Sequence, residues 1–166
     1  GGTIELESTV GVGTVARVRL PLATVASIKP PSARVDPSAT VPRGTVLIVD
    51  DESQVAGAAA RLLRRDHDSV LADSAAAALE LIRGGRKFDV ILCDLMMPEM
   101  NGMDFHAEIV RLDPVLAARM VFMSGGTFTP AARKFADSLR HPLVEKPFRA
   151  AALRDTIRAV VSSASP

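Results

Sequence analysis

Residues 46–51 have the sequence VLIVDD, a short apolar run that ends in two aspartates. Three further short runs also end in polar residues: VILC leads into Asp94, MVFM leads into Ser124, and LVE leads into Lys146. If these four runs are strands of one parallel sheet, their carboxyl ends meet at the edge where open α/β sheets bind ligands. The sequence therefore predicts one functional site that collects polar side chains from four strand ends.

Strands and helices are expected to alternate over residues 44–162. Apolar runs predict strands at 45–49, 68–72, 88–93, 119–123 and 142–145. Helical periodicity predicts helices near 52–65, 74–84, 102–112, 129–138 and 149–162. Strands that are apolar without interruption belong to parallel sheets covered on both faces. Right-handed crossovers then give a doubly wound α/β fold.

Residues 1–22 have the pattern of a β-hairpin. Apolar and polar residues alternate over Thr3–Ser8 and again over Val15–Leu20, and Gly11 and Gly13 lie between the two runs. Two strands alone are marginally stable in water, so we expect the apolar face to be covered by a packing contact. That face consists of Ile4, Leu6, Val18 and Leu20.

Residues 23–43 are rich in proline and serine and have no apolar period, which predicts a semi-extended linker. The net charge of +1 gives no indication of binding to nucleic acid or to an anionic membrane. The single cysteine, Cys93, excludes an intramolecular disulfide and is expected to be a small buried core residue. No apolar stretch is long enough to span a membrane and no signal peptide is visible, so we expect a cytoplasmic protein.

Asp50, Asp51 and Asp94 would place three carboxylates close together. Their mutual repulsion is unfavourable unless a cation is present, and Mg²⁺ prefers oxygen ligands. Lys146 would add a positive charge and Ser124 a hydroxyl donor, both suited to an incoming phosphoryl group. A carboxylate nucleophile would then form an aspartyl phosphate. Taken singly, each element has an ordinary interpretation, because an Asp-Asp pair can begin a helix and a Lys-Pro pair or a strand-end serine can form a turn.

Four segments of the chain carry a resemblance to a known family. They are VLIVDDE (46–52), DVILCDLMMPEMNGMDF (89–105), MSGG (123–126) and EKPF (145–148). With these motifs, residues 44–162 resemble the receiver domain of bacterial two-component response regulators. The resemblance implies a five-stranded parallel sheet in flavodoxin-like order. It also implies phosphoryl transfer from a phosphohistidine to Asp94.

The resemblance further implies a ligand set for Mg²⁺. Asp51, Asp94 and the backbone carbonyl of Met96 would hold the ion, and Asp50 would engage it through water. The metal ligands expected from this resemblance are therefore Asp50, Asp51, Asp94 and Met96.

The same resemblance implies that Ser124 and Lys146 contact the phosphoryl group. The Lys146–Pro147 bond is expected to be cis, as in relatives, because proline lowers the cost of that isomer. Many receivers have an aromatic residue three positions before this lysine, and its rotation reports phosphorylation. This chain has Leu143 there, which puts an aromatic rotamer switch in doubt.

The N-terminal segment GGTIELESTVGVGTVARVRLPL (1–22) resembles the end of a histidine-kinase ATP-binding domain. This resemblance implies that the chain is a fragment of a hybrid histidine kinase that carries a C-terminal receiver. Kinase activity is not expected from the fragment itself, because the nucleotide-binding segments would lie upstream and no phosphoacceptor histidine motif is present. His67, His106 and His141 are each expected to be structural or solvated.

Two alternatives stay open at this point. The receiver-like segment could be a docking or dimerisation module, or the chain could be a free-standing response regulator with an unrelated hairpin. The expected partners are a histidine-kinase core or a histidine phosphotransfer protein, with a homodimer as a further candidate. Neither nucleic acid nor a membrane is expected to contact this chain.

Overall fold

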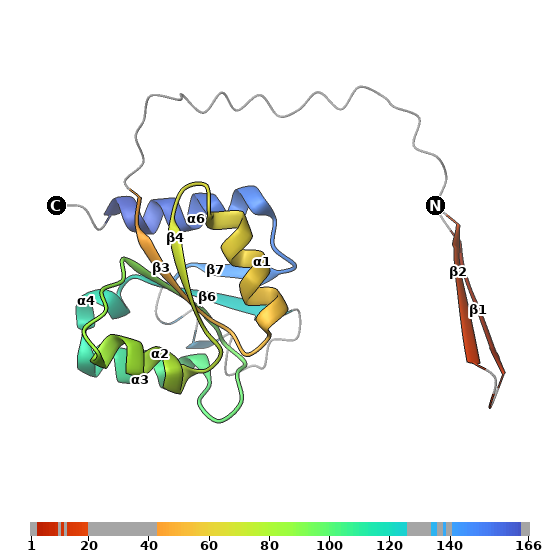
Figure 1. Cartoon of the computed structure of the whole chain (residues 1–166), viewed down its shortest axis with the longest axis horizontal. Helices are drawn as coiled ribbons and strands as arrows, with labels where there is room; N and C mark the ends of the chain where they lie inside the picture. Colours follow the sequence, from red (N-terminus) through yellow and green to blue (C-terminus); the bar gives the residue numbers. More distant parts are fainter. Residues whose placement is uncertain are drawn as a thin grey trace, which may run out of the picture. The chain divides into compact units, whose positions relative to one another are not determined.

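The computed structural model describes residues 3–9, 11, 13–19, 43–125, 134–135, 138 and 141–163. The chain divides into two compact units, residues 1–38 and residues 39–166, and each is described by itself. The first unit contains an antiparallel hairpin of strands β1 (Thr3–Thr9) and β2 (Gly13–Arg19) (Figure 1). The hairpin prediction is therefore confirmed. The predicted linker lies outside the described residues except for Arg43.

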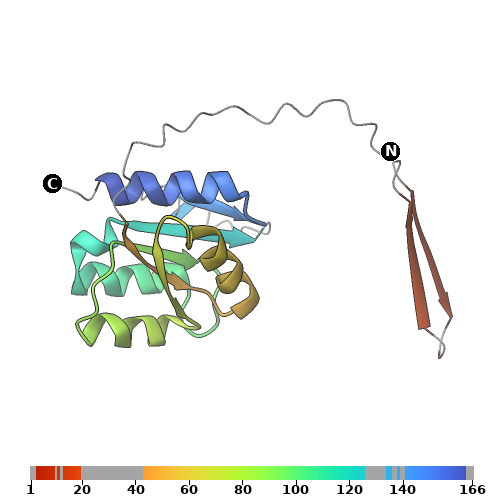
Figure 2. The same cartoon turned by 45° about the horizontal axis from the view of Figure 1, so that its top comes forward.

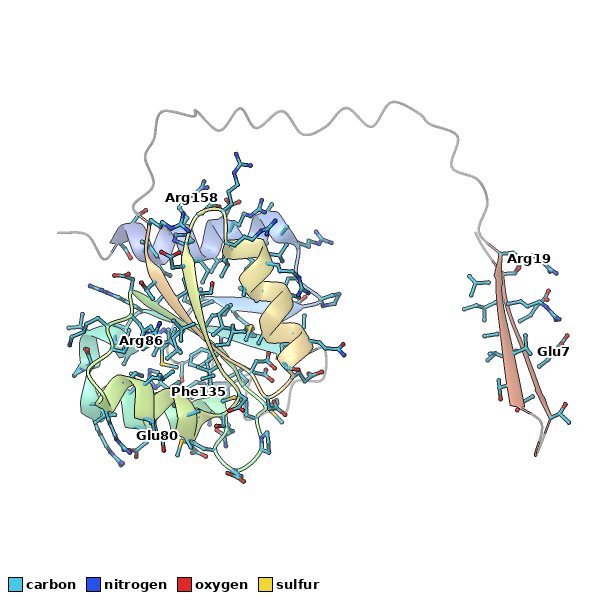
Figure 3. All side chains as sticks on the ribbon, in the orientation of Figure 1. Glu7, Arg19, Glu80, Arg86, Phe135 and Arg158 are labelled. Carbon is cyan, nitrogen blue, oxygen red and sulfur yellow. The ribbon has the colours of Figure 1, made fainter. Side chains whose placement is uncertain are left out.

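The hairpin has one apolar and one charged face because neighbouring residues on a strand point to opposite sides. Ile4 pairs with Val18 and Leu6 with Ala16 on one face. The opposite face carries the ion pairs Arg17–Glu7 at 2.9 Å and Arg19–Glu5 at 2.7 Å, and Figure 3 labels Glu7 and Arg19.

The expected packing contact over the apolar face stays a prediction, because the hairpin unit is described by itself. Ile4 is 71% exposed, Leu6 70% and Val18 58%. Leu20 lies outside the described residues. The hairpin unit by itself therefore leaves an apolar face open.

The second unit contains a parallel sheet of five strands in the order β4-β3-β5-β6-β7. The strands are β3 (Thr45–Val49), β4 (Asp68–Ala72), β5 (Val90–Asp94), β6 (Met120–Gly125) and β7 (Leu143–Lys146). This order confirms the doubly wound, flavodoxin-like α/β prediction. Most strand ends agree with the predicted ends to within one residue, and the largest shifts are at the start of β5 and the end of β6.

Helices cover both faces of this sheet (Figures 1 and 2). The described helices are α1 (Ser53–Leu63), α2 (Ala75–Arg83), α3 (Gly102–Leu112), α4 (Pro114–Ala117) and α6 (Ala150–Ser163). One apolar cluster joins the sheet to α2, α3 and α4, and a second joins it to α1 and α6. Strand β5 supplies both clusters, with Ile91 on one side and Leu92 on the other. Each sheet face is therefore sealed by a separate core.

The structure contains one helix that was not predicted, and one predicted helix lies mostly outside the described residues. The four-residue helix α4 was not predicted, because it is too short to show an apolar period. Asp113 caps it by accepting a hydrogen bond from the Leu116 N–H at 2.9 Å. The helix predicted at 129–138 lies mostly outside the described residues. Among the described helices, none is long and apolar enough to cross a membrane.

Candidate acidic site at the sheet edge

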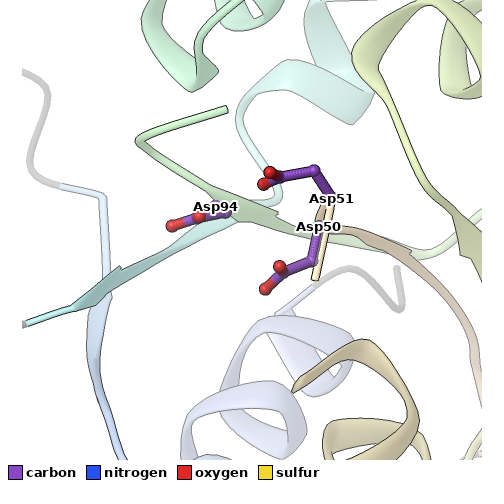
Figure 4. Close-up of side chains that lie close together, drawn as sticks. All are labelled: Asp50, Asp51 and Asp94. Carbon is purple, nitrogen blue, oxygen red and sulfur yellow. The ribbon is translucent and has the colours of Figure 1, made fainter. Parts of the chain in front are cut away.

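The strand ends bring the predicted polar residues together at one edge of the sheet. Asp50 and Asp51 directly follow β3, and Asp94 is the last residue of β5, the strand next to it. One carboxylate oxygen from each of the three lies within 4.8 Å of the others (Figure 4). Ser124 lies near the end of β6, which pairs with β5. The predicted convergence of these carboxylates is thus present in the structure.

Lys146 bridges two of these carboxylates from the end of β7. Its Nζ atom lies 2.8 Å from Asp50 Oδ2 and 3.1 Å from Asp94 Oδ2, and its side chain is 12% exposed. Both aspartates are buried. Burial raises the pKa of Asp50, and the partnership with Lys146 only partly opposes this effect. Burial lowers the pKa of Lys146, but the hydrogen bond to Asp50 and the charge of Asp94 outweigh it and raise that pKa.

Three buried oxygen atoms at the site have no hydrogen-bond partner within the part of the chain that the structure describes. Two of them are Asp94 Oδ1 and Ser124 Oγ, whereas the third, Asp50 Oδ2, is paired with the Lys146 ammonium group at 2.8 Å. A buried polar group without a partner costs about 1–3 kcal/mol, so Asp94 Oδ1 and Ser124 Oγ favour an added ligand. Clustered carboxylate oxygens are also the donors that hard divalent cations prefer. The residues present therefore fit a divalent cation together with an oxyanion.

The segment after β3 holds Asp50 in place. Asp50 N–H donates to the Ala72 carbonyl at 3.1 Å, which ties the end of β3 to β4. Asp50 Oδ1 accepts a hydrogen bond from the Glu52 N–H at 2.9 Å. This leaves Oδ2 for Lys146, so the two Asp50 oxygens have separate roles.

The loop after Asp94 turns sharply to begin α3. The Met100 N–H donates to the Pro98 carbonyl at 2.7 Å, and Glu99 between them has a φ angle of 61°, which is rare for a residue other than glycine. Gly102 approaches the sheet so closely that an added Cβ would lie 2.5 Å from the Asp94 carbonyl oxygen. Sequence reasoning missed this contact, because it joins residues that the loop brings back together.

Three further positions from the sequence analysis lie around this loop and β7. Met96 lies in the loop after Asp94 with its side chain half exposed. The Lys146–Pro147 peptide bond is cis, as expected. Leu143 is partly exposed on β7.

A groove of about 600 Å³ opens beside the site and was not predicted from the sequence. Its walls are apolar and come from α1 and from the residue after Pro147: Val55, Ala58, Leu62 and Phe148. Glu52, Gln54 and Lys146 also line it and add polar groups.

The histidines and the cysteine lie in packed surroundings, as expected. His67 accepts a hydrogen bond at Nδ1 from the Gly44 N–H at 3.3 Å, and burial lowers its pKa. His106 and His141 have ring centroids 5.0 Å apart, and burial lowers both pKa values. Cys93 is fully buried, and burial raises the pKa of its thiol well above the usual value.

Similarity to known proteins extends over most of the chain. The family model for the response regulator receiver domain matches residues 46–158. The sensor histidine kinase AruS of Pseudomonas aeruginosa is 34% identical over 98% of this chain and 16% of its own length. The sensor kinase CckA of Brucella abortus is 29% identical over 95% of this chain and 18% of its own length. The chain thus spans less than a fifth of these two relatives.

A solved structure supports the same fold. A response regulator receiver domain protein from Clostridium thermocellum has a TM-score of 0.63 and 24% identity, over 72% of this chain and 94% of its own chain. The family match covers most of the second unit and all of the strand ends that form the acidic site. The chain therefore belongs to the response regulator receiver domain family of two-component systems.

Proposed function

We propose that residues 44–162 form a phosphoaccepting receiver domain in which Asp94 takes a phosphoryl group from a phosphohistidine in a two-component phosphorelay. The observation that carries this proposal is the pair of buried oxygens, Asp94 Oδ1 and Ser124 Oγ, which have no hydrogen-bond partner among the described residues and lie at the site of the Lys146 ammonium group. A nucleophile, a hydroxyl donor and a cation together suit phosphoryl transfer, which depends mainly on positioning and charge stabilisation.

The transfer forms one bond and breaks one bond. A carboxylate oxygen of Asp94 attacks phosphorus, and the P–N bond to the donor imidazole breaks. The nitrogen keeps the electron pair and takes a proton from solvent. Lys146 and Ser124 contact the phosphoryl oxygens in this proposal, and Lys146 exchanges part of its pairing with Asp50 and Asp94 for that contact.

Asp50, Asp51, Asp94 and the backbone carbonyl of Met96 would hold Mg²⁺ in this site, with Asp50 engaged through water. The clustered carboxylate oxygens support this assignment. Bound Mg²⁺ would neutralise charge on the carboxylates and on the phosphoryl oxygens. The ligand chemistry favours Mg²⁺ over softer metals, because no described histidine or cysteine side chain belongs to the cluster.

The parent protein in this proposal is a cytoplasmic hybrid histidine kinase. Residues 1–22 would be the end of its ATP-binding domain and residues 23–43 a linker to the receiver. The matches to AruS and CckA support this, because they extend over nearly the whole chain and so include the hairpin. The partner would be the kinase core or a histidine phosphotransfer protein.

The test is intact-mass analysis after incubation with acetyl phosphate, with and without Mg²⁺. We expect wild type to gain one phosphate only with Mg²⁺ and Asp94→Asn to gain none. Asp155→Asn, an exposed aspartate on α6, is the matched control and should behave as wild type. If no sample gains phosphate and beryllofluoride also fails to bind, the domain is a docking module and the proposal is wrong.

A further inference from the structure

Glu52 occupies the N-cap position of α1, but its side chain does not cap the helix. Its backbone N–H bonds to Asp50 Oδ1, a contact that any side chain at this position would keep. The carboxylate is instead 67% exposed and lies 4.0 Å from Lys146 Nζ. At this exposure and distance the ion pair contributes little stability. The described fold therefore gives the Glu52 carboxylate no structural role.

The Glu52 carboxylate lies at the groove, beside the ammonium group that contacts Asp94. It lines the groove together with Gln54 and Lys146, and Lys146 also contacts Asp94. A donor that approaches Asp94 through this groove must therefore come close to Glu52. A charge at this position acts on the donor before transfer takes place.

The charge balance of the site gives Glu52 its influence. The three aspartates contribute three negative charges and Lys146 one positive charge. A divalent cation would cancel the remaining two, so the loaded site would be near neutral. The charge of the Glu52 carboxylate then determines whether an incoming donor is repelled by a net negative charge or approaches a nearly neutral site.

We propose that Glu52 is a specificity-determining residue that disfavours strongly anionic small phosphodonors relative to donors with a P–N bond and less negative charge, such as a phosphohistidine. This inference rests on the proposed phosphoacceptor function of Asp94. Like charges a few ångströms apart near a protein surface repel one another, whereas a donor with less negative charge is repelled less. Glu52 would thus protect the relay from free metabolic acyl phosphates.

Two small donors, acetyl phosphate and phosphoramidate, differ in net charge and in the bond that breaks, so they test this preference. With acetyl phosphate, Asp94 forms a bond to phosphorus, the P–O bond breaks, and acetate leaves with the electron pair. With phosphoramidate, the P–N bond breaks, and ammonia leaves with the electron pair. Acetyl phosphate enters as a dianion, while phosphoramidate is a zwitterion with less net negative charge.

The experiment measures phosphorylation rates by intact mass with Mg²⁺, using wild type, Glu52→Gln, Glu52→Asp and Glu145→Gln. Glu145 is the matched control, because it is exposed and adjacent to Lys146 in sequence but makes no described contact with it. At low salt, Glu52→Gln should raise the acetyl phosphate rate about fivefold and the phosphoramidate rate about twofold. Glu52→Asp keeps the charge and should keep the wild-type ratio of the two rates.

Salt provides the second readout. At about 1 M salt, charges are screened beyond about 3 Å, so the preference gained by Glu52→Gln should disappear. Equal acceleration with both donors, an effect that salt does not reduce, or the same change in Glu145→Gln would each overturn the inference. If wild type accepts phosphate from neither donor and also fails to bind beryllofluoride, the proposed function fails instead, so the two failures are distinguishable.

Discussion

The two units of the chain use the same kind of element in opposite ways. In β5, every residue is buried, and Val90, Ile91, Leu92 and Cys93 are fully covered. In β1, every residue is exposed, including Ile4 and Leu6. Burial of a large apolar side chain stabilises a fold by about 1.5–3 kcal/mol, so β5 supports its own unit and β1 does not. The described part of the receiver unit therefore has a core of its own, while the hairpin by itself has none.

The largest expected effect comes from matched leucine truncations in the two units. Leu92→Ala should lower the free energy of unfolding by about 2–5 kcal/mol, because it leaves a cavity inside a covered strand. Leu6→Ala should change it by less than about 0.5 kcal/mol. Urea unfolding followed by circular dichroism measures both. A loss at Leu6 as large as at Leu92 would break the comparison.

A second pair tests how tightly the receiver is packed near its site. Gly102→Ala should destabilise the unit by about 1–3 kcal/mol, because its Cβ would lie 2.5 Å from the Asp94 carbonyl oxygen. The same shift should slow phosphorylation of Asp94. Gly57→Ala in α1 is the control, where the nearest atom is the flexible Arg61 Nη1 at 3.4 Å. It should be neutral or stabilise by up to about 1 kcal/mol.

Urea unfolding and the acetyl phosphate rate are measured on both glycine variants. The hairpin offers a contrast, since an added Cβ at Gly13 would meet no atom within 4 Å, and a substitution there is disfavoured instead by the φ angle of 138°. If Gly102→Ala keeps wild-type stability and rate, the loop after Asp94 is looser than its geometry indicates.

The acidic site could be predicted because its polar side chains lie at the ends of strands. Each of Asp50, Asp94, Ser124 and Lys146 follows or closes a short run, and parallel strands bring such ends to one edge. The order of the strands was predicted from the family resemblance, since periodicity fixes the elements but not their neighbours.

The parts that escaped prediction depend on contacts between distant segments. The groove needs α1 and the residue after Pro147 to lie side by side, and no local pattern encodes that. The close approach of Gly102 to Asp94 arises from a loop whose turn is centred on Glu99, a residue with no particular preference for that conformation. The exposure of Glu52 beside Lys146 likewise appears only once the strands are assembled.

A smaller effect is expected from pH and should be confined to the receiver, because residues 1–22 contain no histidine. Burial lowers the pKa of His67, whose Nδ1 accepts the Gly44 N–H. Above the ordinary value of 6.5 the ring is neutral in both states and contributes nothing. As the pH falls through 6.5, the unfolded chain takes up the proton first, so folding loses stability.

Unfolding free energies measured at about pH 7.5 and about pH 5.5 test this. His67→Asn should reduce the loss of unfolding free energy between the two pH values by about 1 kcal/mol. The variant can be less stable at both pH values, because only the difference between them is the readout. An unchanged difference would show that His67 does not contribute to the pH dependence. His106 and His141 would account for what pH dependence is left, because burial lowers their pKa values too.

The smallest effect is expected from removing the hairpin. Deletion of residues 1–22 should change the free energy of unfolding of the receiver by less than about 0.5 kcal/mol, because the core clusters of the sheet contain no residue from β1 or β2. The acetyl phosphate rate should also stay the same. Leu6→Asp in the full chain is the matched control, since it disrupts the apolar face without shortening the chain. A loss above about 1 kcal/mol in both variants would mean that the hairpin docks on the receiver, whereas no loss in either leaves its apolar face available to the kinase domain that we propose lies upstream.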